Sequence, residues 1–280
     1  MDSIVFFYFV LGLFVGSFLN VVVLRLNTGR DMVHSRSSCF SCGKTLSWYE
    51  LIPLVSFFVQ NGRCRRCKSK ISWQYPIVEL TSGFLFASVA WHEFGIWNGD
   101  VLIGQILDSI FYILIFSVLL AITVYDARHK IIPNILVYVF DALAFLTVLG
   151  FGNWSLLGDS SLKIENFITG LIFFSFFAGI WFLSQGRWMG FGDAKLALGL
   201  GWLLGPSLGI AGLVLSFWIG ALFGLAALSI RRLFSRWGRD TISLQSEIPF
   251  APFLVVGAFL AFLFDIGFFD LQNLFVLYVF

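Results

Sequence analysis

Residues 101–124 read VLIGQILDSIFYILIFSVLLAITV and contain a single charged side chain, Asp108. A helix of about 20 mostly apolar residues spans the hydrocarbon of a bilayer, so this stretch predicts a transmembrane helix. The rest of the 280-residue chain has the same character, since 59% of its residues are hydrophobic and 12% are charged. Soluble domains carry about 25% charged residues. The composition therefore indicates a membrane protein that crosses the bilayer several times.

About eight apolar stretches have the length or composition of a span, the sixth of them short. They are 3–24, 76–94, 101–124, 132–150, 166–185, 194–204, 208–230 and 250–270. We therefore expect an all-α polytopic membrane protein with a first helix at 1–24, one insertion at 25–75 and a membrane domain at 76–280. The first stretch lacks a basic region before it and a small-residue cleavage site after it, which favours a retained helix over a signal peptide.

The basic residues lie almost entirely on one side of this topology. With the N-terminus outside, the inner loops are 25–75, 125–131, 186–193 and 231–249, and of 18 Lys and Arg residues only Lys163 falls on the other side. Basic residues in short loops remain cytoplasmic, so the pattern predicts cytoplasmic inner loops and an even number of spans. We interpret this charge as facing anionic lipid rather than nucleic acid.

All four cysteines lie in the large insertion, as Cys39-Phe-Ser-Cys42 and Cys64-Arg-Arg-Cys67, with 21 residues between the pairs. Two such pairs can bring four thiolates around one tetrahedral Zn²⁺, and Gly43 permits the turn after the first pair. Two disulfides or four buried thiols are the alternatives, but a reducing cytoplasm argues against disulfides, and buried thiols need no paired spacing. Because four protein ligands leave no open position, we expect one structural zinc ion. The apolar segment 48–58 between the pairs is too short to span, so it lies on the membrane surface or packs on the zinc site.

Two aspartates are predicted at the same cytoplasmic level although 67 positions separate them. Asp126 follows the third span, and Asp193 precedes the sixth. Each has a simpler explanation, because Asp193 is a favoured helix N-cap and Asp126 can pair with a nearby basic residue. The flanking Gly190 and Gly192 favour an active-site loop, since glycine adopts conformations barred to other residues and lets another segment approach closely.

A carboxyl pair of this kind can hydrolyse a peptide bond. Two carboxylates within about 3 Å share one proton, so the pair supplies a base for water and an acid for the carbonyl oxygen. Asp108 and Asp141 lie within predicted spans without a turn motif beside them, and we expect packing or hydrogen-bonding roles for both.

These segments together resemble the type IV prepilin peptidase family of bacterial inner membranes, whose members are leader peptidases and N-methyltransferases. The match includes the tetracysteine loop and five further motifs along nearly the whole chain. These motifs are Gly16-Ser17-Phe18-Leu19-Asn20-Val21-Val22, Tyr75-Pro76-Ile77-Val78-Glu79, Asp126 with Ile132-Pro133-Asn134, Gly190-Phe191-Gly192-Asp193, and Ile248-Pro249-Phe250-Ala251-Pro252-Phe253. One departure is Ala251, where the family pattern has Gly.

The resemblance implies that Asp126 and Asp193 cleave a short basic leader after Gly at the cytoplasmic face, and that the new N-terminal residue, usually Phe, is then methylated. The substrates would be prepilins and the pseudopilins of type II secretion. S-adenosylmethionine would be the methyl donor, although the chain has no Gly-rich nucleotide loop of the Rossmann kind. Glu50 and Glu79 are candidates for the methyl-transfer site. The alternatives are a solvated loop charge for Glu50 and an interfacial partner of a basic residue for Glu79.

Three other functions fit parts of the sequence. A presenilin-like intramembrane aspartyl protease also combines a Tyr-Asp pair, here Tyr125 and Asp126, with a Gly-x-Gly-Asp motif, but it does not account for the cysteines or the N-terminal motif. An ion-coupled transporter would place its carboxylates near mid-membrane. A structural assembly factor would tolerate Asp193→Asn. The sequence leaves the oligomeric state open.

Overall fold

The computed structural model describes residues 2–28, 36–95, 102–152, 163–235 and 249–279. Its described secondary structure is helical, apart from two isolated β-bridges in the insertion. The chain divides into two compact units, Met1–Val124 and Tyr125–Phe280. The elements are α1 (Asp2–Arg25), η1 (Trp48–Leu51), α2 (Val55–Val59), α3 (Gln74–Gly95), α4 (Leu102–His129), α5 (Asn134–Val148), α6 (Ile164–Ser184), α7 (Phe191–Ser235), α8 (Ala251–Leu263) and α9 (Phe268–Val279).

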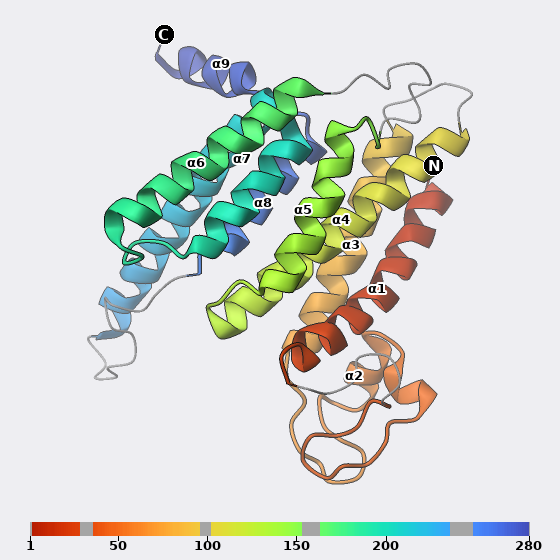
Figure 1. The fold of residues 1–280 in the computed structure, drawn as a ribbon. Helices are drawn as coiled ribbons and strands as arrows, with labels where there is room; N and C mark the ends of the chain where they lie inside the picture. Colours follow the sequence, from red (N-terminus) through yellow and green to blue (C-terminus); the bar gives the residue numbers. More distant parts are fainter. Residues whose placement is uncertain (1, 29–35, 96–101, 153–162, 236–248, 280) are drawn as a thin grey trace. The chain divides into compact units, whose positions relative to one another are not determined.

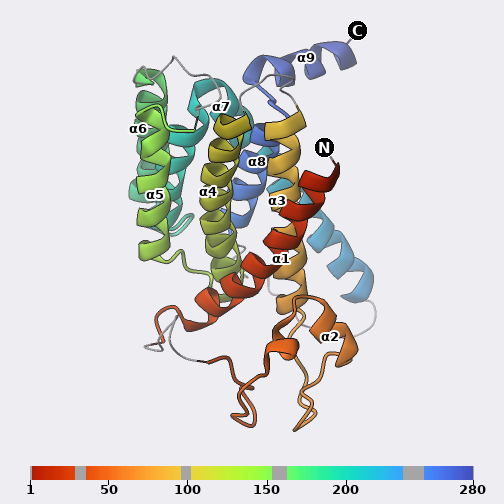
Figure 2. The same ribbon diagram turned by 90° about the vertical axis from the view of Figure 1, so that its right-hand side faces the viewer.

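The first unit is built on a close contact between α1 and α3. A methyl carbon added at Gly16 would lie 2.8 Å from Cα of Glu79, so the two helix backbones touch here. The first part of α4 joins them, with Ile113 packed against Tyr8 and Phe86, and Tyr8 and Ser109 share a hydrogen bond of 2.7 Å. Figures 1 and 2 show the insertion at the end of the unit where α1 stops and α3 begins.

The second unit is organised around α7, which packs against α5, α6 and α8. Small residues again allow close contact, because a methyl carbon at Gly201 would lie 2.6 Å from Cα of Gly170 on α6. The helix is interrupted at Gly205, whose φ of 70° is left-handed, and Pro206 follows. Proline has no backbone NH to donate, so the break separates two helical segments. The predicted spans 194–204 and 208–230 correspond to these two segments.

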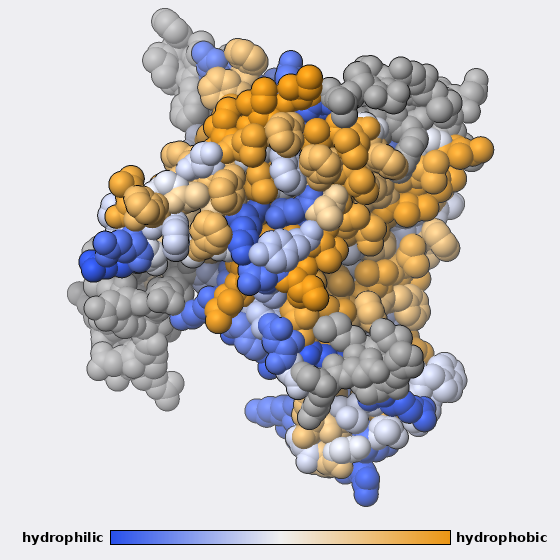
Figure 3. Space-filling view, in the orientation of Figure 1, coloured by the Kyte–Doolittle hydropathy of each residue, from blue (hydrophilic) through white to orange (hydrophobic). Residues whose placement is uncertain are grey.

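Among the described residues, four helices are long and apolar enough to cross a membrane, and two further apolar helices are shorter. The four stretches are Asp2–Arg25, Ile103–His129, Ile164–Ser184 and Phe191–Ala227, and the shorter ones are Asn134–Val148 and Ala251–Leu263. The protein is therefore a multi-pass, all-helical membrane protein. Figure 3 shows hydrophobic side chains over the helices, whereas the insertion is mostly polar.

Two predicted spans end earlier than expected. The stretch 132–150 becomes α5, which stops at Val148 because Gly150 and Gly152 adopt positive φ angles of 93° and 85°. The stretch 250–270 becomes α8, and the backbone leaves the helix before Asp265, whose φ is 49°. The length of an apolar run therefore overestimates the length of these two helices, because turns occur inside the run.

Candidate functional site

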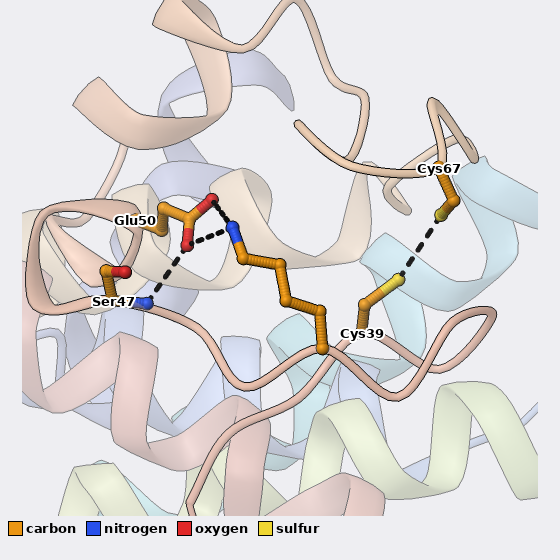
Figure 4. A network of polar contacts seen from close by, with 5 residues as sticks. Cys39, Ser47, Glu50 and Cys67 are labelled. Atoms are coloured by element: carbon orange, nitrogen blue, oxygen red, sulfur yellow. Dashed lines mark hydrogen bonds and ion pairs between the residues drawn. The ribbon is translucent and has the colours of Figure 1, made fainter.

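The four cysteines of the insertion converge on one point. Their sulfur atoms all lie within 4.8 Å of one another, and the cluster consists of Cys39, Cys42, Cys64 and Cys67. The cysteines are free thiols, and the Sγ atoms of Cys39 and Cys67 are 3.8 Å apart (Figure 4). Four sulfurs at about 2.3 Å from a tetrahedral zinc ion stand about 3.8 Å from one another. The donor set and its spacing fit zinc.

Each cysteine pair forms the same tight turn. Cys39 NH donates to the carbonyl of Lys44 and Gly43 NH donates back to that of Cys39, both at 2.9 Å. The second turn repeats the pattern with Cys64 and Lys68. Gly43 has a φ of 67°, as its predicted role requires, but its counterpart Lys68 adopts 59° without being glycine. The same turn therefore forms with glycine in the first pair and with lysine in the second.

The close spacing of the four thiols opposes the ionisation of all of them together. Backbone NH groups of Cys42 and Ser41 lower the pKa of Cys39 to about 6. At Cys42 the Lys44 NH favours the thiolate, but desolvation and the neighbouring thiols prevail and raise the pKa to about 11. Four thiols this close cannot all ionise without a positive ion between them, and a bound metal would supply it.

Glu50 is held next to this cluster by structural contacts. Its carboxylate accepts hydrogen bonds from Lys44 Nζ at 3.1 and 3.2 Å and from the Ser47 NH at 3.0 Å, and Ser47 and Glu50 form the capping box of η1 (Figure 4). The Ser47 NH and then Lys44 lower the pKa of Glu50. The carboxylate thus ties η1 to the first cysteine turn.

Glu79 connects the insertion to the helices. It is buried on α3, where its Oε2 accepts a hydrogen bond of 2.8 Å from the NH of Leu54, and its carboxylate interacts with the Ser17 hydroxyl of α1. Leu54 itself has a positive φ of 59°. Within the part of the chain that the structure describes, the partners of Glu79 are therefore neutral donors, and not the basic residue expected as the alternative.

The apolar segment of the insertion is only partly packed. Phe57 is buried against Trp73, with ring centroids 4.9 Å apart, and against Gly62. In the same segment, Trp48 and Phe58 expose 77% and 59% of their surface. One side of the segment 48–58 thus packs on the rest of the insertion, and the other side remains exposed.

Asp126 and Asp193 come together in the second unit. Asp126 lies in the last turn of α4 and Asp193 in the first turn of α7, and they expose only 4% and 7% of their surface. The charge of Asp126 acts on the Asp193 carboxyl group. Among the described residues, Oδ1 of Asp193 is one of the few buried side-chain oxygens without a hydrogen-bond partner. A buried carboxyl pair with an unused oxygen is suited to bind a reacting molecule.

A third element reaches this pair. The backbone NH of Ala251, the first residue of α8, lies within hydrogen-bonding reach of the Asp126 carboxylate. Free NH groups at a helix N-terminus stabilise negative charge. In the sequence, the segment around Ala251 indicated only a resemblance to the family, and no contact with Asp126 was predicted. A backbone donor has no residue signature, so the sequence could not have shown it.

The two glycines of the predicted active-site loop differ in their surroundings. Neither Gly190 nor Gly192 is among the glycines with positive φ. At Gly192 the requirement is space, because an added methyl carbon would lie 2.9 Å from Cβ of Ile132. At Gly190 the nearest atom would be Oδ2 of Asp193 at 3.6 Å, an ordinary contact. Another segment therefore approaches Gly192 closely, neither glycine has the special backbone conformation, and their part in an active-site loop stays a prediction.

Two other aspartates occupy helix-packing positions. Asp108 is fully buried on α4. Asp141 on α5 faces α7, where the Gly199 NH lies within reach and the charge of Lys195 acts on it. Both positions agree with a packing role, and Oδ1 of Asp141 has no hydrogen-bond partner among the described residues.

These features define a helical membrane protein with a tetracysteine insertion and a buried carboxyl pair. Two family models match the chain, the bacterial peptidase A24 N-terminal domain over residues 10–93 and the type IV leader peptidase family over residues 113–225. The chain belongs to the prepilin leader peptidase/N-methyltransferase family and is a bifunctional membrane enzyme.

Relatives named prepilin leader peptidase/N-methyltransferase occur in several bacteria. The chain is 33% identical to a prepilin leader peptidase/N-methyltransferase of Bacillus subtilis over 91% of this chain and 92% of the relative. It is 31% identical to one of Pseudomonas aeruginosa over 90% and 88% of the two chains, and 31% identical to one of Vibrio cholerae over 70% and 76%. No solved structure matches the chain significantly.

Proposed function

We propose that Asp126 and Asp193 form the peptidase dyad, which removes the leader of type IV prepilins and type II secretion pseudopilins after Gly. The observation that carries this proposal is the buried carboxyl pair, because two helices from separate parts of the sequence bring both groups together. Membership of the family supports the reaction class. A presenilin-like protease or a transporter would share the carboxylates but not this membership.

The dyad acts on water and the peptide carbonyl together. One ionised carboxylate takes a proton from water as its oxygen attacks the carbonyl carbon, and the protonated partner donates to the carbonyl oxygen. Collapse of the tetrahedral intermediate breaks the C–N bond, and the leaving amine receives a proton. The products are a leader with a C-terminal carboxylate and a pilin with a new amine. The Ala251 NH stabilises charge on Asp126, and the free Oδ1 of Asp193 faces no competing partner among the described residues. Because the two groups are coupled, the roles belong to the pair.

We further propose that reaction occurs at the cytoplasmic face of a bacterial inner membrane. The segregation of basic residues supports the orientation. A prepilin has a basic leader followed by an apolar helix, so its scissile bond lies at the same interface. Domain limits of 1–24, 25–75 and 76–280 remain our proposal for the topology.

The tetracysteine cluster would hold one structural Zn²⁺ through Cys39, Cys42, Cys64 and Cys67. The thiolates bound to zinc would fold an insertion that has little apolar core of its own. All four ligands come from the protein, which leaves no position for a substrate. The ion would therefore support the fold of the insertion and take no part in cleavage.

Methyl transfer from S-adenosylmethionine requires a neutral amine and a group that accepts its proton. Of the two candidates, Glu79 suits this role better, because Glu50 is committed to Lys44 and the Ser47 NH. We expect Glu79→Gln to lose methylation and keep cleavage, and Glu50→Gln to retain at least part of both. Methylation at the wild-type rate by Glu79→Gln would exclude Glu79 from the methyl-transfer site.

The test is incubation of the purified protein with a prepilin and S-adenosylmethionine, followed by intact-mass analysis of the product. We expect loss of the leader after Gly and a gain of one methyl group. Asp126→Asn and Asp193→Asn should each abolish cleavage. Cleavage by both variants at the wild-type rate would contradict the dyad, and an inert wild type would favour the transporter or assembly-factor function.

A further inference from the structure

Lys195 lies two residues after Asp193 on α7, yet its side chain is directed to α5. Its Nζ donates hydrogen bonds to Oδ1 of Asn134 at 2.9 Å and to the hydroxyl of Tyr138 at 3.1 Å. The ammonium also lies 5.0 Å from the ring centroid of Tyr138 and 5.3 Å from that of Phe191. Such cation–π contacts and charge-assisted hydrogen bonds hold a lysine in one position.

Both residues bound by Lys195 belong to the start of α5. Asn134 is the first residue of this helix and Tyr138 lies one turn later, so their side chains share one face. The chain reaches Asn134 directly from Asp126. Helix α4 ends at His129, Lys130 turns the backbone with a φ of 54°, and Pro133 precedes α5. The Lys195 contacts thus connect the segment after Asp126 with the segment that carries Asp193.

A second contact joins the same two segments on the other side of Asp193. The backbone of Gly192 lies against Ile132, where no methyl group would fit without displacement. One contact therefore comes one residue before Asp193 and involves Ile132, and the other comes two residues after it and involves Asn134 and Tyr138. Phe191 is itself held by Trp181 of α6, with ring centroids 5.0 Å apart.

We propose that Lys195, Asn134 and Tyr138 form a clasp that sets the separation of the two aspartates. The clasp consists of these three residues, and we assign them a positioning role because their contacts among the described residues join α7 to α5 and do not include the carboxylates of Asp126 and Asp193. This inference rests on the proposed peptidase dyad and deepens it. A carboxyl pair acts as base and acid only within a narrow range of separations, and a displacement of about 1 Å can cost about 10²-fold in rate.

The first test compares Lys195→Met, which removes the ammonium but keeps the apolar stem, with Lys195→Arg, which keeps a cationic donor. We expect Lys195→Met to lower kcat for leader cleavage by about 10- to 100-fold while KM changes by less than about threefold. Lys195→Arg should recover most of the rate. The matched control is Lys130→Met, which removes an exposed lysine from the connecting loop and should keep wild-type kcat.

A double-mutant cycle distinguishes the clasp from a general loss of stability. If Lys195 acts through Asn134, the double variant Asn134→Leu/Lys195→Met should lose no more kcat than the more affected single variant. Tyr138→Phe removes one hydrogen bond but keeps the ring, so its loss should be smaller.

Three results would overturn the clasp. These are a kcat for Lys195→Met within about twofold of wild type, an equal loss in Lys130→Met, or losses that multiply in the double variant. Asp126→Asn is measured in the same assay. If Asp126→Asn cleaves normally, the dyad itself has failed, whereas an inactive Asp126→Asn beside an active Lys195→Met rejects only the clasp.

Discussion

Gly192→Ala perturbs the proposed peptidase site without changing its charge. The added methyl carbon would lie 2.9 Å from Cβ of Ile132, whereas carbon atoms pack at about 3.5–4.0 Å. Relief of the overlap requires a movement of about 1 Å between the segment that follows Asp126 and the segment that carries Asp193. Overpacking of this kind costs about 1–3 kcal/mol of stability, and the displacement should lower kcat for leader cleavage about 10²-fold.

The assay is the initial rate of prepilin cleavage at saturating substrate, with the fraction of folded enzyme measured by size-exclusion chromatography. Gly179→Ala on α6 is the matched control, because nothing lies within 4 Å of its added methyl carbon and it should cleave at the wild-type rate. Gly190→Ala should lose less than Gly192→Ala, since its methyl carbon meets an oxygen of Asp193 at 3.6 Å. A folded Gly192→Ala enzyme with wild-type kcat would refute the close packing as the reason for this glycine.

Further predictions concern the insertion and the helix contacts. Cys64→Ser should reduce bound zinc from one ion per chain to almost none by elemental analysis and make the insertion sensitive to trypsin; full zinc content would contradict the site. The lowered pKa of Glu50 means that its ionised form stabilises the insertion, so Glu50→Gln should lower the melting temperature at pH 7. The difference in melting temperature should begin to shrink as pH falls below about 4.3, the ordinary pKa of Glu, and should be lost once pH falls through the lowered pKa of folded Glu50. A difference in melting temperature that does not depend on pH would count against the ion pair. Gly257→Leu, whose side chain would overlap Ser216 of α7, should destabilise the second unit by about 1–3 kcal/mol, measured by thermal unfolding, whereas Gly224→Leu should not.

The sequence predicted the elements whose signals are local. Runs of apolar residues identified most of the long helices, and the two cysteine pairs identified a cluster whose sulfurs do converge. Helix ends were less predictable, because α5 and α8 stop at turns inside apolar runs. Hydropathy is insensitive to such turns, and only single residues in or directly after the runs, Gly150 and Gly152 after α5 and Asp265 and Gly267 after α8, could have indicated them.

The candidate site was predictable as residue types but not as contacts. Counting spans predicted a common level for Asp126 and Asp193, which stays a prediction, and their proximity could only be a hypothesis until the helices were placed. The Ala251 NH and the Leu54 NH have no residue signature, since any residue offers a backbone donor. Asn134 belongs to a motif that resembles the family and Lys195 lies two residues after another such motif, but nothing in their spacing indicated that they meet.

The most direct test of the dyad separates its two proposed activities in one enzyme. Wild type, Asp126→Asn and Asp193→Asn are reconstituted in lipid nanodiscs and given two substrates, an intact prepilin and a pilin from which the leader has already been removed. We predict that both variants fail to cleave the prepilin but still methylate the precut pilin, which shows that they are folded. Cleavage of the prepilin by either folded variant at a rate near wild type would contradict the proposed peptidase site.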